Sequence, residues 1–483
     1  MRSEDEVSQF TTQFGLAQPI ISPCQFLPPS QKRHHIGCTI AFHDNSTDRS
    51  QFNIFRSTAH IPRALRSIFI ISWFFSLIFL PFYWSSTAPT RPWPEYGNVR
   101  DLSTIHNNLS TINAKHVHQY LDSLLLPIYN GNLPPRMRCE MIDIQRYAPL
   151  GKTNLSVLLT GNMYNEDDIL PTQLHALIDL ILSLPHITWG ISAYESGTPL
   201  HRPTSVIVRE VIPLIFERLG VPRDRIFTTT NSTRPSMKGV KTRIQSLANV
   251  RNHAVSPLFS RSSKTHYDLS LFFNDVYFCP RDMMELLLHH TQQKAHVTCG
   301  IDWKDKQRFY DLWVARDISG DLFSPTVYEV EQEWSWGQWP SSKGEQLFRN
   351  HPPSRIRYES KLPVQCYVCW NGILVMDAKP FYDGGVRFRS PKSEEGECDE
   401  GEASRIIKDF WAAGYNRVQV LPSVNFAYQL GLAEYVRGKN EPERKYDERL
   451  LSPNVEWQPA PEKSRCIGGN YDFGSNDWRK THL

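Results

Sequence analysis

An acidic residue at the end of an apolar run gives the first indication of chemistry in this sequence. The run 269–273 (LSLFF) leads directly into Asn274-Asp275. A carboxylate at the tip of a buried strand suits a hard cation such as Mg²⁺ or Mn²⁺, which can neutralise a diphosphate leaving group. Asp275 is therefore a candidate metal ligand. The alternative is that Asp275 closes a turn or caps the helix expected after Pro280.

Two arginines could receive a phosphate group. Arg243 and Arg251 lie eight residues apart in the basic run 241–254, so a helix would place them on one face. Guanidinium groups bind phosphate through two parallel hydrogen bonds. A solvated helix face is the alternative. The sequence contains no G-x-x-x-x-G-K-S/T, G-x-G-x-x-G, H-E-x-x-H or G-x-S-x-G motif, which argues against the chemistries that those motifs indicate.

The position of such residues depends on elements that the sequence patterns predict. Apolar runs predict strands, and apolar residues at i, i+3, i+4 and i+7 predict amphipathic helices. This alternation predicts an α/β fold with a mainly parallel sheet and helices on both faces, whose ligands would bind at the carboxyl ends of the strands. Strands are expected at 155–160, 187–193, 226–227, 269–273 and 296–300, and helices at 174–181, 205–219, 241–254 and 281–289.

Residues 67–84 predict a single transmembrane helix. The segment has 18 residues and no charge, just enough to cross a hydrocarbon core of about 30 Å. Aromatic residues all round it disfavour a buried core helix, and the long sequence before it disfavours a cleaved signal peptide. Arg56, Arg63 and Arg66 closely precede it and only Arg91 closely follows it. The positive-inside rule then places the N-terminus in the cytosol and the rest in the secretory lumen.

Seven cysteines follow this segment, and an oxidising lumen would allow disulfides. Because seven is odd, at least one thiol is free or pairs with another chain. Cys366 and Cys369 form a C-x-x-C motif, for which redox chemistry, zinc binding and a structural role are the alternatives. A structural role is favoured, because the motif lies in an apolar, strand-like run. The seven are Cys139, Cys279, Cys299, Cys366, Cys369, Cys398 and Cys466.

The composition is that of a globular protein. The 483 residues are 40% hydrophobic, and 53 Lys and Arg against 50 Asp and Glu give a formal net charge of +3. This excludes a multi-pass membrane protein and a fully disordered chain, and it leaves no large basic surface for nucleic acid. We expect a largely disordered cytosolic tail at 1–66, the membrane segment at 67–84, a stem at 85–115, a lumenal domain at 116–436 and a C-terminal tail at 437–483.

Five ordered blocks carry a family resemblance. They read FFNDVYFCPRDMMELL, VTCGIDW, FYDLWVARDISG, CWNGILVMDAKPF and GECDEGEASRIIKDFWAAGYNRVQVLPSVNFAY, and the segments YESG and RIQSLANVRNHAV fit the same pattern. Over residues 150–430 the chain resembles the fungal family of cryptococcal α-1,3-mannosyltransferases and capsule-associated proteins, glycosyltransferase family 69. The resemblance implies a type II Golgi enzyme that transfers mannose from GDP-mannose to a glycan, with a GT-A-like fold and a divalent metal.

The resemblance also implies roles for individual residues. Asn274-Asp275-Val276 is similar to the family's N-D-V metal site, so Asn274 and Asp275 would hold Mn²⁺ or Mg²⁺ with a single carboxylate. Three acidic residues are expected to orient the acceptor hydroxyl or the donor sugar, namely Asp302, Asp317 and Glu402. Five residues are expected to bind substrate, namely Glu195, Arg251, Arg316, Trp370 and Asn371.

Structural roles are the alternatives for several of these residues. Arg316 and Asp317 could form a salt bridge at a sheet edge, and Glu402 could complement the dipole of a helix N-terminus. Trp370 could belong to the core, and Asn371 with the following glycine could form a turn.

The expected function is mannosyl transfer from GDP-mannose to a glycan hydroxyl, in an α-1,3 linkage, by a Golgi membrane enzyme. Three alternatives stay open. One is another nucleotide-sugar donor, such as UDP-xylose or UDP-glucose. Another is a non-catalytic glycan-binding or scaffold protein, which the single carboxylate of the metal motif would suit. The last is a thiol oxidoreductase that uses Cys366 and Cys369.

The predicted topology determines where the chain can carry N-glycans. Sequons begin at Asn45, Asn108, Asn154 and Asn231, and only the last three follow the membrane segment. Asn108, Asn154 and Asn231 are therefore the candidates, with burial as the alternative for Asn154, which opens a predicted core strand. We expect glycosidase treatment to shift the protein from a eukaryotic host on a gel, and the shift to survive Asn45→Gln. A shift that depends on Asn45 would invert the topology.

Overall fold

The structure is a computed structural model that describes residues 116–259, 266–326, 329, 346–438, 451–467 and 477–481. The predicted cytosolic tail, membrane segment and stem all lie outside these ranges. Within them, no helix combines the length and the apolar character that crossing a bilayer requires. The described fold covers the predicted lumenal domain and parts of the predicted C-terminal tail.

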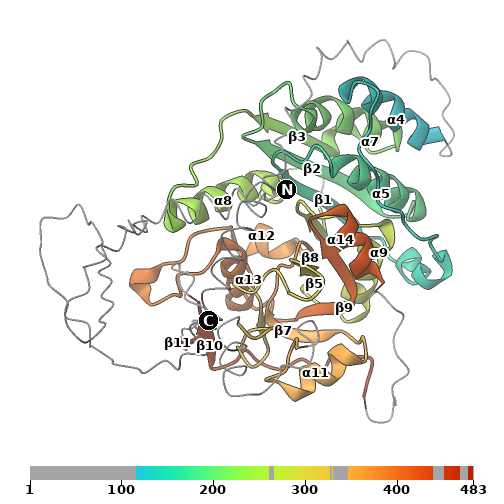
Figure 1. The fold of residues 1–483 in the computed structure, drawn as a ribbon. Helices are drawn as coiled ribbons and strands as arrows, with labels where there is room; N and C mark the ends of the chain where they lie inside the picture. The colour runs from blue at the N-terminus through green and yellow to red at the C-terminus, as the bar shows by residue number, and fades with distance from the viewer. Residues whose placement is uncertain are drawn as a thin grey trace, which may run out of the picture. The chain divides into compact units, whose positions relative to one another are not determined.

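A nine-stranded sheet forms the centre of the fold, in the order β3-β2-β1-β4-β8-β5-β9-β7-β6 (Figure 1). Strands β1 to β4 are parallel to one another, and β5 is parallel to β9. Strand β8 is antiparallel to its neighbours β4 and β5, and β7 is antiparallel to β9 and β6. The nine are β1 (Ser156–Met163), β2 (Thr188–Ser196), β3 (Ile226–Asn231), β4 (Leu269–Phe273), β5 (Val297–Trp303), β6 (Arg316–Asp317), β7 (Val364–Val368), β8 (Ile373–Asp377) and β9 (Val418–Ala427).

The prediction of a mainly parallel sheet is confirmed for the half formed by β1 to β4, but the other half is mixed. Following the pairings across the sheet, seven of the nine strands point the same way, and β7 and β8 are reversed. Only four residues separate β7 from β8. Such a link is too short for the crossover helix of a β-α-β unit, so the regular alternation of the sequence ends after β5.

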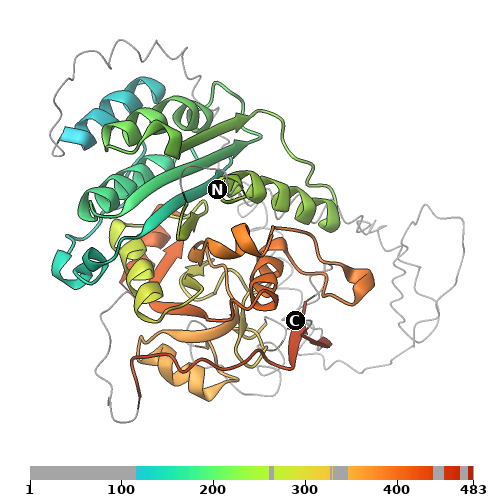
Figure 2. The same cartoon turned by 180° about the vertical axis from the view of Figure 1, so that it is seen from behind.

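Helices cover both faces of the sheet, as predicted. Leu271 and Phe273 of β4 pack in one hydrophobic cluster with α5, α7 and α9, whereas Phe272 packs in a second cluster with α8 and α13. Figures 1 and 2 show the sheet with its flanking helices from opposite sides. Successive side chains of a strand point to opposite faces, so the two clusters are the two layers of the core. The α-helices are α4 (Val117–Ile128), α5 (Leu170–Ser183), α6 (Pro203–Val206), α7 (Ile212–Arg218), α8 (Val240–Ala254), α9 (Pro280–Gln292), α11 (Pro352–Glu359), α12 (Lys379–Asp383), α13 (Glu402–Ala412) and α14 (Leu430–Arg437).

The predicted helix 205–219 is divided by a wider turn. A π-helical turn, Ile207–Val211, lies between α6 and α7, and Pro213 is in the first turn of α7. Proline has no N–H to donate to the preceding turn, and a π-turn accommodates the missing bond. The predicted kink at Pro213 thus takes the form of this turn. The other elements predicted up to residue 300 are found within a few residues of their expected bounds.

The chain reverses its direction across the sheet at β1. Strands β2 and β3 add on one side of β1, and β4 then adds on the other side. In open α/β sheets, ligands bind outside the carboxyl ends of the strands at such a reversal. The segments that lie there are 164–166 after β1 and 274–276 after β4. These two segments are the centre of the candidate site.

Three disulfides join six of the seven cysteines, in the pairs Cys139–Cys279, Cys299–Cys369 and Cys398–Cys466. Cys366 is free and buried, so the expectation of at least one unpaired thiol is confirmed. Burial, and next the charge of Asp317, raises the pKa of the Cys366 thiol well above its ordinary value. The interpretation of Cys366 and Cys369 as a redox pair is wrong, because Cys369 is bonded to Cys299 and a buried thiol of high pKa is unreactive.

Part of the predicted C-terminal tail belongs to the folded domain. Strands β10 (Lys463–Cys466) and β11 (Asp477–Lys480) pair with each other, and Cys466 is bonded to Cys398, just before α13. At the other end of the domain, Asn154 and Asn231 of the sequons are both exposed. The alternative that Asn154 is too buried for modification is therefore wrong, because the residue precedes β1 and is exposed, and its modification stays a prediction.

Candidate active site

Asp275 lies at the centre of a tight turn at the end of β4. The Val276 N–H donates to the Asn274 carbonyl oxygen at 2.9 Å, which is the i to i+2 bond of a γ-turn. The Asn274 N–H and its side-chain Nδ2 both donate to the Gly372 carbonyl oxygen, at 3.0 and 2.8 Å. Asn274 thus joins β4 to a neighbouring turn, and its predicted role as a metal ligand stays a prediction. The fixed turn leaves Asp275 partly exposed at its tip.

A second carboxyl group, that of Glu166, interacts with Asp275 from the end of β1. Glu166 is buried, and its Oε1 accepts a hydrogen bond from the Tyr164 N–H at 3.3 Å. Burial, followed by the negative charge of Asp275, raises the pKa of the Glu166 carboxyl well above its ordinary value. The two strands that flank the reversal of the sheet therefore each supply one acid. The sequence placed Glu166 at a strand end but did not distinguish it from Asp167 and Asp168, which follow it.

The pair formed by Glu166 and Asp275 suits a divalent cation. A cation close to two carboxylates removes the repulsion that otherwise favours the protonated form of one of them. Mg²⁺ is commonly held by one or two carboxylates together with phosphate oxygens of the substrate. In the part of the chain that the structure describes, no group of three or more His, Cys, Asp or Glu side chains could hold a metal ion. Oxygens of water or of a phosphate ligand would therefore complete the coordination.

Asp302, predicted to be catalytic, lies fully buried in β5. The Tyr428 hydroxyl donates to its Oδ2 at 2.7 Å, and its Oδ1 is buried without a hydrogen-bond partner. Burial, followed by the charge of Asp311, raises the pKa of the Asp302 carboxyl well above its ordinary value. Asp302 is therefore biased towards the neutral acid, which can donate a hydrogen bond as well as accept one.

Asp302 is close to the turn at the end of β4, and Gly372 lies between them. A Cβ added at Gly372 would lie 3.2 Å from the Val276 Cγ1 and 3.6 Å from the Asp302 Cβ. The residue also has a φ of +84°, which favours glycine. A side chain at this position would therefore crowd Val276 in the turn that carries Asp275, and it would reach Asp302 at an ordinary contact distance.

Asn371 precedes this glycine and forms the predicted turn with it. Its φ is +52°, its Nδ2 donates to the Gly300 carbonyl oxygen at 2.8 Å, and its N–H donates to the Asp311 Oδ2 at 2.9 Å. The interpretation of Asn371-Gly372 as a turn is thus confirmed. The predicted role of Asn371 in substrate binding stays a prediction, since its amide nitrogen holds β5.

Three other predicted residues come together between α8 and α13. Arg251 of α8 forms a buried ion pair with Glu402, the first residue of α13. The Arg251 guanidinium also lies over the Trp370 ring, 4.5 Å from its centroid, a cation–π contact. Trp370 is buried against Phe272, as its core interpretation predicts, and its Nε1 has no hydrogen-bond partner. This group places one arginine between the segment that follows β7 and the start of α13.

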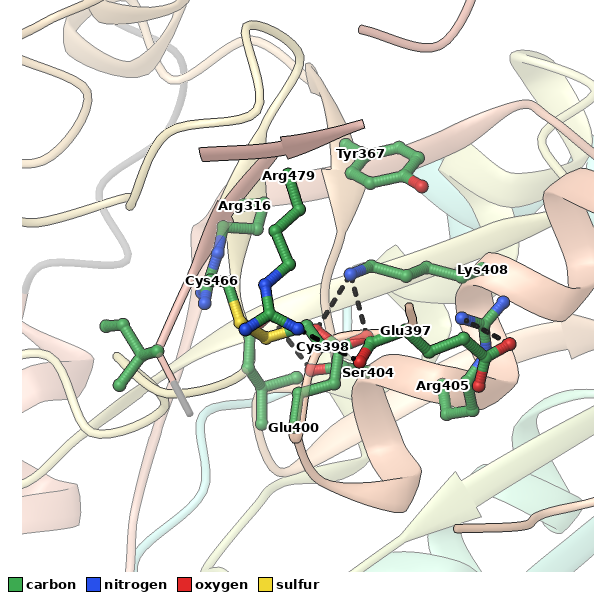
Figure 3. A network of polar contacts seen from close by, with 12 residues as sticks. Arg316, Tyr367, Glu397, Cys398, Glu400, Ser404, Arg405, Lys408, Cys466 and Arg479 are labelled. Atoms are coloured by element: carbon green, nitrogen blue, oxygen red, sulfur yellow. Dashed lines mark hydrogen bonds and ion pairs between the residues drawn. A yellow bond between two sulfur atoms is a disulfide. The ribbon is translucent and has the colours of Figure 1, made fainter. Parts of the chain in front are cut away.

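Arg316 and Asp317 lie apart from these residues, in β6 at the edge of the sheet. Arg316 donates from Nε to the Arg465 carbonyl oxygen at 2.7 Å, and the Asp317 Oδ1 accepts from the Ser319 N–H at 2.8 Å. Figure 3 shows Arg316 in a buried polar network beside the Cys398–Cys466 disulfide. In sheet order, β9 and β7 separate β6 from β5, which carries Asp302. The structure thus gives both residues a local structural role and does not bring them to Asp275.

Glu195 shapes the loop after β2. Its Oε1 accepts the Thr198 N–H at 2.7 Å, and its Oε2 accepts the Ser205 hydroxyl at 2.8 Å. Burial raises the pKa of the Glu195 carboxyl. Both oxygens are therefore used within this loop, and the predicted substrate contact of Glu195 stays a prediction.

Asp311 and Tyr428, the two partners of Asp302, were not selected from the sequence. Both lie inside blocks that carry the family resemblance, FYDLWVARDISG and the final VNFAY. Nothing in a linear pattern shows that they meet Asp302, because 126 residues separate Tyr428 from it in the chain.

Comparison with known proteins identifies the family of the chain. The family described as cryptococcal mannosyltransferase 1 matches residues 156–409. The α-1,3-mannosyltransferase CMT1 of Cryptococcus neoformans var. neoformans serotype D is 32% identical over 359 residues, which are 70% of this chain and 74% of that protein.

Solved structures show weaker similarity. The mannosyltransferase PcManGT of Pyrobaculum calidifontis, in complex with GDP-Man and Mn²⁺, has a TM-score of 0.34 and 9% identity, covering 65% of this chain and 66% of that one. Glucosyl-3-phosphoglycerate synthase of Mycobacterium tuberculosis has a TM-score of 0.28 and 12% identity, covering 61% and 78%. By its match over residues 156–409 and its identity to CMT1, the chain belongs to the cryptococcal mannosyltransferase 1 family.

Proposed function

We propose that this chain is a glycosyltransferase that transfers mannose from GDP-mannose to a glycan hydroxyl in an α-1,3 linkage, on a GT-A-like fold. The family and the identity to an α-1,3-mannosyltransferase support the sugar and the linkage. The observation that carries the proposal is that Glu166 and Asp275 follow the adjacent parallel strands β1 and β4, where the sheet reverses. A diphosphate leaving group needs positive charge, and two carboxylates are a site for Mn²⁺ or Mg²⁺.

In this proposal, Asp275 and Glu166 hold the cation. When bound, the divalent cation neutralises the charge that develops on the diphosphate as the glycosidic bond breaks. Arg251 is placed to bind a phosphate oxygen, because its guanidinium is already oriented by Glu402 and by the Trp370 ring. The burial of these side chains excludes water, which strengthens each of their charge interactions.

Asp302 orients a sugar hydroxyl in this proposal. Its raised pKa favours the neutral acid, which can both donate to and accept from a hydroxyl group. Tyr428 fixes the orientation of the carboxyl by donating to Oδ2. With Glu166, the proposed metal site has two carboxylates instead of one. The alternative of a non-catalytic scaffold was based on the single carboxylate, so this second acid weakens it.

We also propose a type II location in the Golgi membrane, with residues 67–84 as the anchor. The support is the uncharged apolar run and the cluster of arginines that precedes it. The N-glycan experiment described above tests the orientation.

A panel of nucleotide sugars tests the donor directly. A soluble version that starts near residue 100 is incubated with GDP-mannose, UDP-xylose or UDP-glucose, and release of the nucleotide is measured with and without glycan acceptors. We expect turnover with GDP-mannose, because all the acids of the site lie beyond residue 150. Turnover with a UDP-sugar and not with GDP-mannose would show that the UDP-sugar is the donor. A folded protein that hydrolyses no donor would support the scaffold alternative.

The Asp275→Asn change tests the metal site. It keeps the shape of the turn and removes the charge, so we expect the rate of transfer to fall by about 10²–10³, as for loss of one key electrostatic contact. The temperature of unfolding should not fall, because the change also relieves the repulsion on Glu166. EDTA should abolish wild-type activity, and Mn²⁺ or Mg²⁺ should restore it.

Asp224→Asn is the matched control for this change, since Asp224 is an exposed acid before β3. It should leave both the rate and the metal requirement unchanged. An Asp275→Asn protein that transfers mannose at the wild-type rate would leave Asp275 as a turn residue only.

The Arg251→Lys change tests phosphate binding. Lysine keeps a positive charge towards Glu402 but cannot form two parallel hydrogen bonds or stack its planar group on Trp370. We expect the KM for GDP-mannose to rise at least about tenfold, the equivalent of one charge-assisted hydrogen bond. Arg223→Lys, at an exposed arginine that is paired with Glu217, is the control and should leave the KM unchanged.

The Glu402→Gln change measures how much the ion pair between Arg251 and Glu402 contributes to stability, apart from the binding of phosphate by Arg251. Removing one partner of a buried ion pair lowers the free energy of unfolding by about 3–5 kcal/mol. An unaltered KM in a folded Arg251→Lys protein would confine Arg251 to its structural pair with Glu402.

A further inference from the structure

Gln173 connects the two segments that meet at the reversal of the sheet. It lies in the first turns of α5, and its side chain is fully buried. Its Nε2 donates to the Asn274 carbonyl oxygen at 2.9 Å and to the Val276 carbonyl oxygen at 3.0 Å. One amide nitrogen therefore binds the carbonyl groups on both sides of Asp275.

These two bonds hold the γ-turn from the side of α5. On its other side, the Asn274 backbone N–H and amide donate to the Gly372 carbonyl oxygen. With both carbonyls and the Asn274 amide engaged, the backbone on each side of Asp275 has little freedom to rotate. The backbone position of Asp275 is thus determined by partners from two distant parts of the chain.

Gln173 also lies on α5, the helix that begins shortly after Glu166. The Glu166 carbonyl oxygen accepts the Ile169 and Leu170 N–H groups, each at 3.1 Å, so the Glu166 backbone is attached to the start of α5. Gln173 follows within the next turn. A single buried side chain therefore links the segment with Glu166 to the turn with Asp275, across the boundary between β1 and β4.

We propose that Gln173 is a positioning residue that holds Asp275 at the separation from Glu166 at which the two carboxylates share one divalent cation. The inference rests on the proposed function, because it assigns Gln173 to the metal site of that reaction. Gln173 does not touch the cation. It acts through the backbone of residues 274–276, as partners behind metal ligands commonly do.

The Gln173→Leu change tests this role with a matched control. Gln365→Leu makes the same chemical change at another buried glutamine, which binds the backbone of Gln458 through both its Nε2 and its Oε1 at 2.8 Å. Each variant loses two hydrogen bonds to the backbone, so both should unfold at a lower temperature. Only Gln173→Leu should alter the response to metal.

Two measurements report that response. The Mn²⁺ concentration for half-maximal transfer should rise about 10–100-fold in Gln173→Leu, with kcat largely recovered at saturating Mn²⁺. Binding of Mn²⁺ in the presence of GDP, followed by the loss of the free-ion signal in electron paramagnetic resonance, should weaken by the same factor without any turnover. Gln365→Leu should match the wild type in both measurements.

An unchanged Mn²⁺ requirement in folded Gln173→Leu, or an equal shift in Gln365→Leu, would overturn the inference. If Gln173→Leu does not fold, Gln173→Met keeps the length of the side chain without an N–H group, and the same outcomes apply to it. A wild-type protein that transfers mannose without any divalent cation would overturn the inference but leave the transferase function. A folded wild-type protein that neither transfers mannose nor binds Mn²⁺ with GDP would remove both.

Discussion

The burial of carboxyl groups beside other acids is the constraint on which the arrangement of this domain depends. Burial, followed by the charge of Asp275, raises the pKa of Glu166 at the reversal of the sheet, and burial, followed by the charge of Asp311, raises the pKa of Asp302 beside it. Groups that repel would separate if the loops that carry them could move. The fold therefore has to supply contacts that keep these acids in place, and most of those contacts are made by backbone carbonyl groups.

The contacts come from parts of the chain that are far apart in sequence. The Gly372 carbonyl oxygen receives the Asn274 side chain, and the Gly300 carbonyl oxygen receives that of Asn371. The Cys299–Cys369 disulfide links β5 to the segment that leads into the Asn371-Gly372 turn. Amide side chains suit this task, because they bind carbonyl groups firmly and add no charge to a site that already carries several negative ones.

Much of the sheet could be predicted from the sequence, because burial leaves a clear pattern. The run 269–273 is apolar except for Ser270 and corresponds residue for residue to β4, which is buried on both faces. The alternation of strands and helices up to residue 300 likewise predicted the parallel half of the sheet. The mixed half could not be predicted in this way, since β7 and β8 are both apolar and only their partners decide their direction.

The site was harder to predict than the sheet, for reasons that particular residues show. Glu166 and Asp167 are adjacent acids, but Asp167 is bound by Arg202 and by the Thr204 N–H, whereas Glu166 interacts with Asp275. No spacing rule distinguishes the two. In the same way, Asp317 has the residue type of a catalytic acid, and only the pairing of β6 shows that it lies at the sheet edge.

The Cys139–Cys279 disulfide closes one half of the domain into a covalent ring. Its cysteines are 140 residues apart, and the ring between them includes β1 to β4 and the helices α5 to α8. In the chain-entropy description, closing a ring of this size restricts the unfolded chain by about 5 kcal/mol. Because Glu166 and Asp275 are both inside the ring, a single protease cut within it cannot release either acid from the rest of the molecule. The chain could therefore be cut at a surface loop between Cys139 and Cys279, and the two pieces would stay joined by the disulfide.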